Sequence, residues 1–343
     1  MGQPTLRADT TNRVPDFNEI YSLVRAHLSG ESAAELNRAA VEGLLHELGG
    51  KVRLEAAKRT ASEEPTALLV SRTNVFERNI AYVRVREVSA GLAQAVGGAW
   101  EGLGRTNHLI GTVLDLRYAG GGDYAAAAAT VGLFLSQAEP LLDWGQGMAR
   151  STAKSGAIGR PVAVLVNGQT SGAAEALAAV LRQTGRGLIL GAATSGQAMV
   201  KQAFPLKDGQ RLWIATTPVR LGDGAEIGAE GLKPDIPVKV GAANERTYYE
   251  NPFQRIVSAR NATAAALAAS LGLSVTQGPP PVPLNEAELV REHQEGLSPD
   301  EAPPPTLKAR PQRPVVRDPA LARALDLLKG LAVVRQGHHG FSH

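Results

Sequence analysis

The sequence contains no cysteine in its 343 residues. This absence excludes disulfides, thiolate metal ligands and a cysteine nucleophile, while a reducing and an oxidising compartment both stay open. Aromatic residues make up only 4% of the chain, which leaves few platforms on which bases could stack. The 36 Lys and Arg residues are scattered and nearly balanced by 33 Asp and Glu residues, so we expect no nucleic-acid partner.

Long apolar runs are also missing. No stretch of 18 or more apolar residues occurs, so we expect no membrane-spanning segment. Residues 1–15 are too polar for a signal peptide, which leaves two alternatives: a cytoplasmic chain, or a chain whose signal peptide has been removed. The histidines stand singly or crowd the polar C-terminal tail, so we expect no metal site, and no motif indicates a cofactor.

Two amphipathic segments come first along the chain. Residues 16–29 and 32–48 have the apolar spacing of helices. A Ser-x-x-Glu capping box begins the second segment, and a Gly-Gly pair typical of a helix end follows it. We therefore predict an N-terminal helical hairpin within residues 1–57.

From residue 66 onward, strand-like runs alternate with amphipathic helices, which is typical of crossover units on a largely parallel sheet. The expected strands are residues 66–71, 80–86, 109–116, 162–166, 188–190, 199–205 and 211–219. The expected helices are residues 89–103, 123–137 and 172–184. This pattern predicts an α/β core over residues 58–245.

The C-terminal part combines proline-rich sequence with helices. Residues 278–314 are rich in proline around one helical segment at 285–294, which indicates a semi-rigid linker. A last helix is predicted over residues 318–334, with Asp318 as its N-cap and a proline at its first position. We group residues 246–343 as a linker with C-terminal helices. The apolar stripe of the last helix and the N-terminal hairpin could both serve assembly into a homo-oligomer.

Four segments of the core carry a family resemblance. They are IAYVRVREVSAGLAQAVGGAW (80–100), VLDLRYAGGG (113–122), VAVLVNGQTSGAAEAL (162–177) and GLILGAATSGQAMVKQAFPLKDGQRLWIATTPV (187–219). With these segments in this order, the chain resembles the tail-specific, or C-terminal processing, serine peptidases. The resemblance implies a crotonase-like core of ββα crossover units and a peptide or an unfolded protein C-terminus as partner.

The same resemblance bears on location and domain content. Bacterial members of the family usually work in the cell envelope or periplasm, which fits this chain if a signal peptide has been removed. Family members usually carry a peptide-binding PDZ domain between the helical hairpin and the core. Only about thirty residues separate Gly50 from Ile80 here, so we expect that domain to be missing.

The catalytic pattern of the family departs from this sequence at two positions. In the family a serine stands three residues before a glutamate at a helix start, and a lysine follows twenty-five residues after the serine. A serine hydroxyl attacks once a base takes its proton, and a buried, neutral lysine can be that base. Aligning Glu175 with the glutamate puts Gly172 at the nucleophile's position and Gln197 at the lysine's. Neither side chain can do that chemistry, so the resemblance implies a degenerate member.

The parts that would stabilise a transition state are matched more closely. Gly121, Gly122 and Ala173 stand at the positions that supply the oxyanion hole, at a Gly-Gly turn and a helix start. We interpret Glu175 as a first-turn residue that complements the helix dipole rather than as an acid. The expected frame of the site is therefore present while its reactive groups are replaced.

Two polar neighbours leave an alternative open. Ser171 directly precedes Gly172, and we interpret it as the N-cap of the next helix, because one step around a helix turns a side chain by about 100°. Lys201 lies four residues after Gln197 on an expected strand, hence on the same face. A displaced Ser171 and Lys201 dyad would restore a serine nucleophile with a base.

Three functional hypotheses follow. The leading one is a catalytically inactive pseudopeptidase with a peptide-binding or scaffolding role. The alternative is an active serine peptidase that uses the displaced Ser171 and Lys201 dyad. A third class, acyl chemistry on a thioester, follows from the oxyanion hole that crotonase-like folds share, although no residues indicate a coenzyme A pocket.

Overall fold

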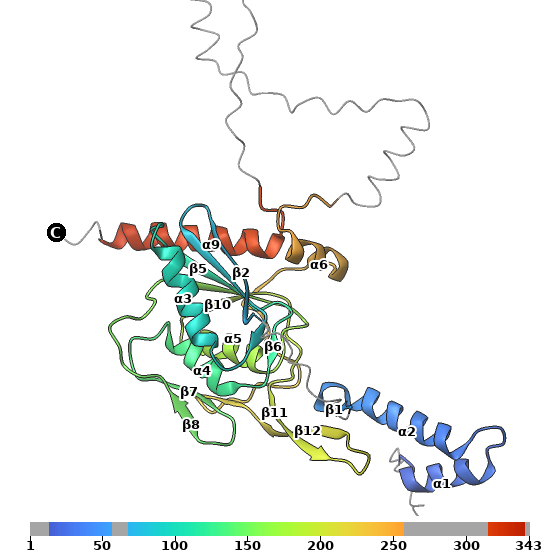
Figure 1. Cartoon of the computed structure of the whole chain (residues 1–343). Coiled ribbons are helices and arrows are strands. Elements are labelled where there is room, and N and C mark those ends of the chain that lie inside the picture. The colour runs from blue at the N-terminus through green and yellow to red at the C-terminus, as the bar shows by residue number, and fades with distance from the viewer. Residues whose placement is uncertain (1–13, 57–67, 257–314, 340–343) are drawn as a thin grey trace, which may run out of the picture.

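The computed structural model describes residues 14–56, 68–256 and 315–339. A central sheet with helices on both faces forms the body of the molecule, and an N-terminal helical hairpin projects from one side (Figure 1). The predicted α/β class is confirmed. The domain boundaries expected from the sequence stay predictions.

The central sheet has the strand order β14-β10-β9-β5-β3-β2, and every pair is parallel except β2 with β3. Its strands are β2 (Val70–Phe76), β3 (Ile80–Val85), β5 (Gly111–Asp115), β9 (Val162–Val166), β10 (Gly187–Gly191) and β14 (Ile236–Pro237). All residues of β3, β5 and β9 are buried, because strands in the middle of a parallel sheet are covered on both faces. Apolar runs predicted β5 and β9, whereas β3 was predicted from an alternating pattern although all its residues are buried.

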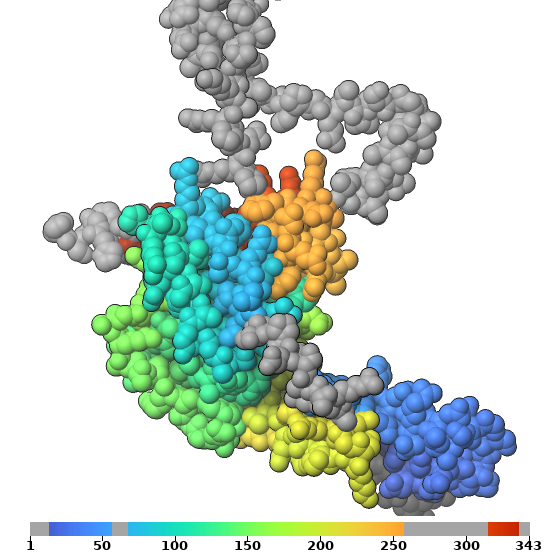
Figure 2. Space-filling view, in the orientation of Figure 1, coloured from blue at the N-terminus to red at the C-terminus, as the bar shows by residue number. Residues whose placement is uncertain are grey.

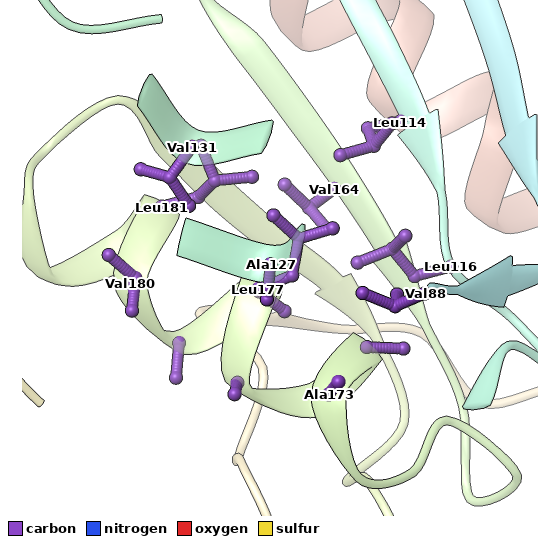
Figure 3. Packing of buried hydrophobic residues seen from close by; sticks show 14 of the residues in the cluster. Val88, Leu114, Leu116, Ala127, Val131, Val164, Ala173, Leu177, Val180 and Leu181 are labelled. Carbon is purple, nitrogen blue, oxygen red and sulfur yellow. The ribbon is translucent and has the colours of Figure 1, made fainter. Parts of the chain in front are cut away.

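Helices cover both faces of this sheet. One face packs against α3 (Leu92–Gly104), α4 (Tyr124–Gly132) and α5 (Ala173–Gln183), and the other against α9 (Pro319–His339). Side chains alternate along each strand, so Leu114 and Val164 face the three-helix layer (Figure 3) while Val113 and Leu165 face α9. The sheet thus separates two hydrophobic cores, one on each of its faces.

A buried ionic network fastens α9 to the end of β5. Arg117 pairs with Asp115 (Nη2 to Oδ2, 2.7 Å) and with Asp318 (Nη1 to Oδ2, 2.8 Å), and all three side chains are buried. Asp318 is also the N-cap, since its Oδ1 accepts from the N–H of Ala320 at 3.1 Å. The predicted N-cap is confirmed, and it joins the last helix to the core.

The N-terminal hairpin consists of α1 (Phe17–His27) and α2 (Ala33–Leu48). Both predicted helices are confirmed, including the capping box formed by Ser32 and Glu35. Neither helix has a buried residue, and the hairpin forms a separate lobe beside the body (Figure 2). A turn, η1 (Gly49–Lys51), leads from this lobe into the body.

A small antiparallel sheet of order β1-β12-β11 joins the hairpin to the body. Its strands are β1 (Val52–Glu55), β11 (Met199–Pro205) and β12 (Arg211–Pro218). The remaining elements are β4 (Glu87–Val88), β6 (Gly120–Gly121), β7 (Pro140–Asp143), β8 (Met148–Arg150), β13 (Arg220–Leu221) and α6 (Ala242–Glu250). The sequence patterns predicted β11 at its observed bounds but missed β1, β7, β8 and α6.

Two predicted elements differ from those observed. The strand expected at 66–71 is β2 at Val70–Phe76, whose polar side chains suit the edge of the sheet, where alternate residues are exposed. The helix expected at 123–137 ends at Gly132, after which the chain turns into the core. The helical segment expected at 285–294 lies outside the described residues. Within the described residues, no helix is both long enough and apolar enough to cross a bilayer.

Candidate active site cleft

Gly172 lies at the apex of a sharp turn between β9 and α5. It is the N-cap residue of α5, with φ 58° and ψ −126°, a conformation that glycine adopts far more easily than other residues. Thr170 holds the turn: its Oγ1 donates to Leu116 O at 2.8 Å and accepts from the N–H of Asn167 at 3.0 Å. A strand-to-helix turn of this kind exposes the residue at its apex.

The backbone carbonyl of Gly121 fills the space where a side chain at Gly172 would begin. A Cβ built on Gly172 would overlap Gly121 O, which is backbone and cannot swing aside as a side chain could. Gly121 itself has φ 128°, and a Cβ there would overlap Val88 O. Both positions therefore require glycine in this arrangement.

The same peptide bears on the predicted oxyanion hole. Every described peptide bond is trans, so the C=O and N–H of one peptide point in opposite directions. Since Gly121 O points at Gly172, the N–H of Gly122 in that peptide points away from it. Ala173 is the buried first residue of α5, where N–H groups lack helical partners. The N–H of Ala173 therefore lies at the helix start, whereas the N–H of Gly122 is directed away from Gly172.

Gln197 lies in the loop before β11, packed against the N-terminal segment. A Cβ built on Gly50 would overlap Gln197 Cδ, so the amide lies directly over the backbone of the turn that ends the hairpin. The N–H of Gln197 donates to Glu175 Oε2 at 2.9 Å. The position expected for the base thus carries a neutral side chain that lies against Gly50.

Glu175 holds the loop that carries Gln197. Its buried carboxylate accepts from the N–H groups of Gly196 and Gln197, each at 2.9 Å, and from Thr194 Oγ1. Burial raises the pKa of Glu175, and these hydrogen bonds oppose that rise in part. Glu175 is part of the support behind the cleft, a role that its place in the first turn of α5 did not predict.

Ser171 is not the N-cap of α5, so that interpretation is wrong. The N-cap is Gly172, because its positive φ delays the helix start by one residue. The N–H of Ser171 instead donates to Ala119 O at 3.0 Å, and its Oγ lies 3.2 Å from a Cβ built on Gly120. Within the described residues, no hydrogen bond of this Oγ is present, and it lines the cleft.

Lys201 is half-buried on β11 and also lines the cleft. Burial lowers its pKa, and the nearby charge of Arg53 lowers it further. The alternation argument that related Lys201 to Gln197 does not hold, because β11 begins at Met199 and the pairing with β12 shifts between Val200 and Lys201. Both side chains nevertheless reach the same cleft.

The cleft is a cavity of about 540 Å³ between the turn at Gly172 and the small sheet. Six of the residues singled out from the sequence line it: Gly121, Gly122, Ser171, Gly172, Gln197 and Lys201. Six others complete the lining: Arg53, Glu87, Tyr124, Met199, Val200 and Trp213. The catalytic roles expected for these residues stay predictions. Within the described residues, no cluster of three or more His, Asp or Glu side chains could hold a metal.

Arg53 and Trp213 are two of the six lining residues that the sequence did not indicate. Arg53 reaches the cleft because β1 pairs with β12, with Arg53 opposite Trp213. Trp213 is fixed in turn by its Nε1, which donates to Glu55 Oε2 at 2.6 Å. The alternating VRLE pattern after the Gly-Gly pair was the only local signal for β1, and it is short.

Residues 79–238 match the model of peptidase family S41. The carboxy-terminal processing protease CtpA of Bacillus subtilis is 25% identical over 229 residues, covering 66% of this chain and 46% of that protein. The carboxy-terminal-processing protease of Bartonella bacilliformis is 32% identical over 139 residues, covering 39% of this chain and 32% of that protein. The chain thus spans less than half of the length of these curated relatives.

Among solved structures, a candidate peptidase of Parabacteroides merdae is similar with a TM-score of 0.51 and 16% sequence identity. The match covers 77% of this chain and 90% of that one. At this level of identity the likeness concerns the fold. It agrees with the α/β core described above.

Proposed function

We propose that this chain, a member of the tail-specific protease family through its peptidase family S41 domain at residues 79–238, is a pseudopeptidase that binds peptides without cleaving them. Cleavage by a serine and a lysine needs a hydroxyl that can attack and an amine that can take its proton. Gly172 and Gln197 stand at the positions where the family has these groups. The first has no side chain, and the second has an amide that is not a base near neutral pH.

The observation that carries the proposal is the overlap between Gly121 O and the place of a Cβ on Gly172. A nucleophile at this position would need both a side chain and room for it, and the carbonyl occupies that room. The same peptide directs the N–H of Gly122 away from Gly172. Under this proposal, the backbone around Gly172 would also disfavour a serine side chain if one were introduced at this position.

A cleft remains, and its lining suits binding. Trp213, Met199 and Val200 offer apolar contact surface, while Ser171 and Gln197 offer polar groups for a peptide backbone. A pocket that combines apolar walls with a few placed polar groups is the usual form of a ligand site. A peptide segment of a few residues is the ligand that we propose for it.

Labelling with a fluorophosphonate probe and a fluorogenic peptide assay test the absence of catalysis. We expect neither labelling nor cleavage in the wild-type protein, with an active serine peptidase as positive control. The proposal would be wrong if labelling and cleavage were both present and both lost in Ser171→Ala. Binding of an unlabelled peptide, measured by calorimetry, tests the other half of the proposal.

A second candidate function is hydrolysis by a displaced dyad. Ser171 and Lys201 line the same cavity. The pKa of Lys201 is lowered, which favours the neutral amine that a general base requires. Under this candidate, Lys201→Ala abolishes turnover without lowering the free energy of unfolding. Lys207→Ala, at an exposed lysine in the turn after β11, is the matched control. Equal turnover in the two variants would exclude the dyad.

A further inference from the structure

One wall of the cleft carries two cations on a single sheet face. Arg53 lies opposite Trp213 in the β1–β12 pair, and Trp213 lies opposite Ala203 in the β12–β11 pair. Directly opposed residues share a face, and so do residues two apart on a strand. Lys201, two residues before Ala203, therefore lies on the face that carries Arg53. All but Ala203 line the cavity.

These two cations have no carboxylate partner in the described part of the chain. No ion pair within 4.0 Å joins Arg53 or Lys201 to an acid there. Other partly exposed arginines and lysines of the body do form such pairs with nearby acids. The acidic residue that lines the cavity, Glu87, lies on β4 beside Gly120, on the opposite wall. The positive charge is therefore concentrated on the small sheet.

The opposite side of the cavity carries groups of both kinds: the carboxylate of Glu87 lines it, and the N-terminus of α5 lies beside it. Helix α5 begins there at Ala173, and its N-cap residue Gly172 has no side chain that could cap the helix start. N–H groups at a helix N-terminus carry partial positive charge and favour negative groups nearby. Ser171 adds a hydroxyl with no hydrogen-bond partner among the described residues. Because Glu87 lies on this side, the small sheet is the side of the cavity that favours an anion.

We propose that Lys201 and Arg53 form a carboxylate-binding subsite for an organic acid whose apolar part lies against Trp213 and Met199. This inference rests on the proposed function, because it requires a cleft that binds and does not cleave. A planar guanidinium beside an ammonium suits a carboxylate, which accepts several hydrogen bonds. The carboxylate belongs either to a peptide C-terminus or to a free organic acid, and the test separates these sources.

The electrostatics of the free protein agree with this assignment. Burial and the charge of Arg53 lower the pKa of Lys201, so two like charges lie near each other, and neither has an ion-pair partner among the described residues. A bound carboxylate would favour the charged form of Lys201 and return its pKa toward the ordinary value of 10.5. The same reasoning predicts that Glu87 repels an anion from its own wall and so fixes the orientation of the ligand.

The test compares one peptide in two forms. A fluorescein-labelled peptide ending in Ala-Leu-Ala, as the free acid and as the C-terminal amide, is titrated with the full chain by fluorescence anisotropy. We expect the acid to bind more tightly, and Lys201→Gln to weaken it about tenfold to a hundredfold, the usual loss for a charged hydrogen bond. Lys207→Gln, at an exposed lysine, should bind the acid as the wild type does.

Several outcomes separate the possibilities. Competition by hexanoate at the affinity of the peptide acid would assign the subsite to free organic acids, and its failure to compete would assign it to peptide C-termini. Equal binding of the acid and the amide, or equal binding by the Lys201→Gln and Lys207→Gln variants, overturns the subsite while peptide binding stands. Cleavage of the peptide overturns the proposed function instead. If Lys201→Gln fails to fold, binding of the peptide acid is measured with Arg53→Gln instead, and we expect it to be weakened in the same way.

Discussion

Replacing Gly172 by alanine is expected to destabilise the fold strongly, because the added methyl group strains the backbone conformation and also overlaps a neighbouring atom. Gly172 has φ 58° and ψ −126°, and such a conformation costs a residue with a side chain about 1–3 kcal/mol. The added Cβ would also overlap Gly121 O, and overpacking of a filled site costs about 1–3 kcal/mol. Together these give roughly 2–6 kcal/mol, a large share of the about 5–15 kcal/mol by which domains are stable.

The matched control is Gly122→Ala, one residue after the obstructing carbonyl. A Cβ at Gly122 meets nothing within 4 Å, and no positive φ is imposed there. We expect this variant to lie within about 0.5 kcal/mol of the wild type, as surface substitutions usually do. Urea unfolding followed by circular dichroism measures both, with the free energy taken from midpoint and slope. A Gly172→Ala variant as stable as Gly122→Ala would refute the reasoning.

The same geometry makes a prediction about restored chemistry. The double variant Gly172→Ser with Gln197→Lys returns both residue types of the family, yet we expect no peptide cleavage. The serine Cβ would meet Gly121 O, and the N–H of Gly122 would still point away. Gain of cleavage in a fluorogenic peptide assay would contradict this expectation, because it would require the peptide between these glycines to rotate.

Two further predictions concern the supports of the cleft and of the core. Glu175→Gln should cost about 1–3 kcal/mol, since a buried acceptor is lost. Burial raises the pKa of Glu175 above 4.5. The wild type should therefore lose stability as pH rises through the folded-state pKa of this group. The glutamine variant cannot titrate there, so its urea midpoint should change less over the same pH range. Asp318→Ala leaves Arg117 with one buried partner and should cost about 3–5 kcal/mol with faster amide exchange in α9. Asp326→Ala, which removes an exposed pair, should cost at most about 1 kcal/mol.

The sequence was most informative where one local pattern decided the structure. The central strands could be predicted because strands covered on both faces are continuous apolar runs, as in β9, which was predicted at Val162–Val166. The capping box at Ser32 was equally local. The N-cap at Ser171 failed because a positive φ at Gly172 delays the helix by one residue, and a serine beside a glycine does not show which of them begins the turn.

The geometry of the cleft could not be predicted because it depends on non-local pairing and on one peptide's orientation. Trp213 and Glu55 are 158 residues apart in the sequence, and only the pairing of β1 with β12 brings Arg53 into the cavity. The contact between Gly50 and Gln197 has the same origin. A Gly-Gly turn also permits either orientation of its peptide, so the sequence alone did not show that Gly121 O faces Gly172.

Lys201 separates the two proposals for the cleft, because they require opposite protonation states. A carboxylate subsite needs the ammonium, so binding of the peptide acid should weaken as pH rises through the lowered pKa of Lys201. A dyad needs the neutral amine, so turnover should increase over the same range. Burial raises the pKa of Tyr124, which also lines the cavity, so this phenol should not mask the change. Turnover that increases while acid binding stays constant would favour the peptidase over the pseudopeptidase.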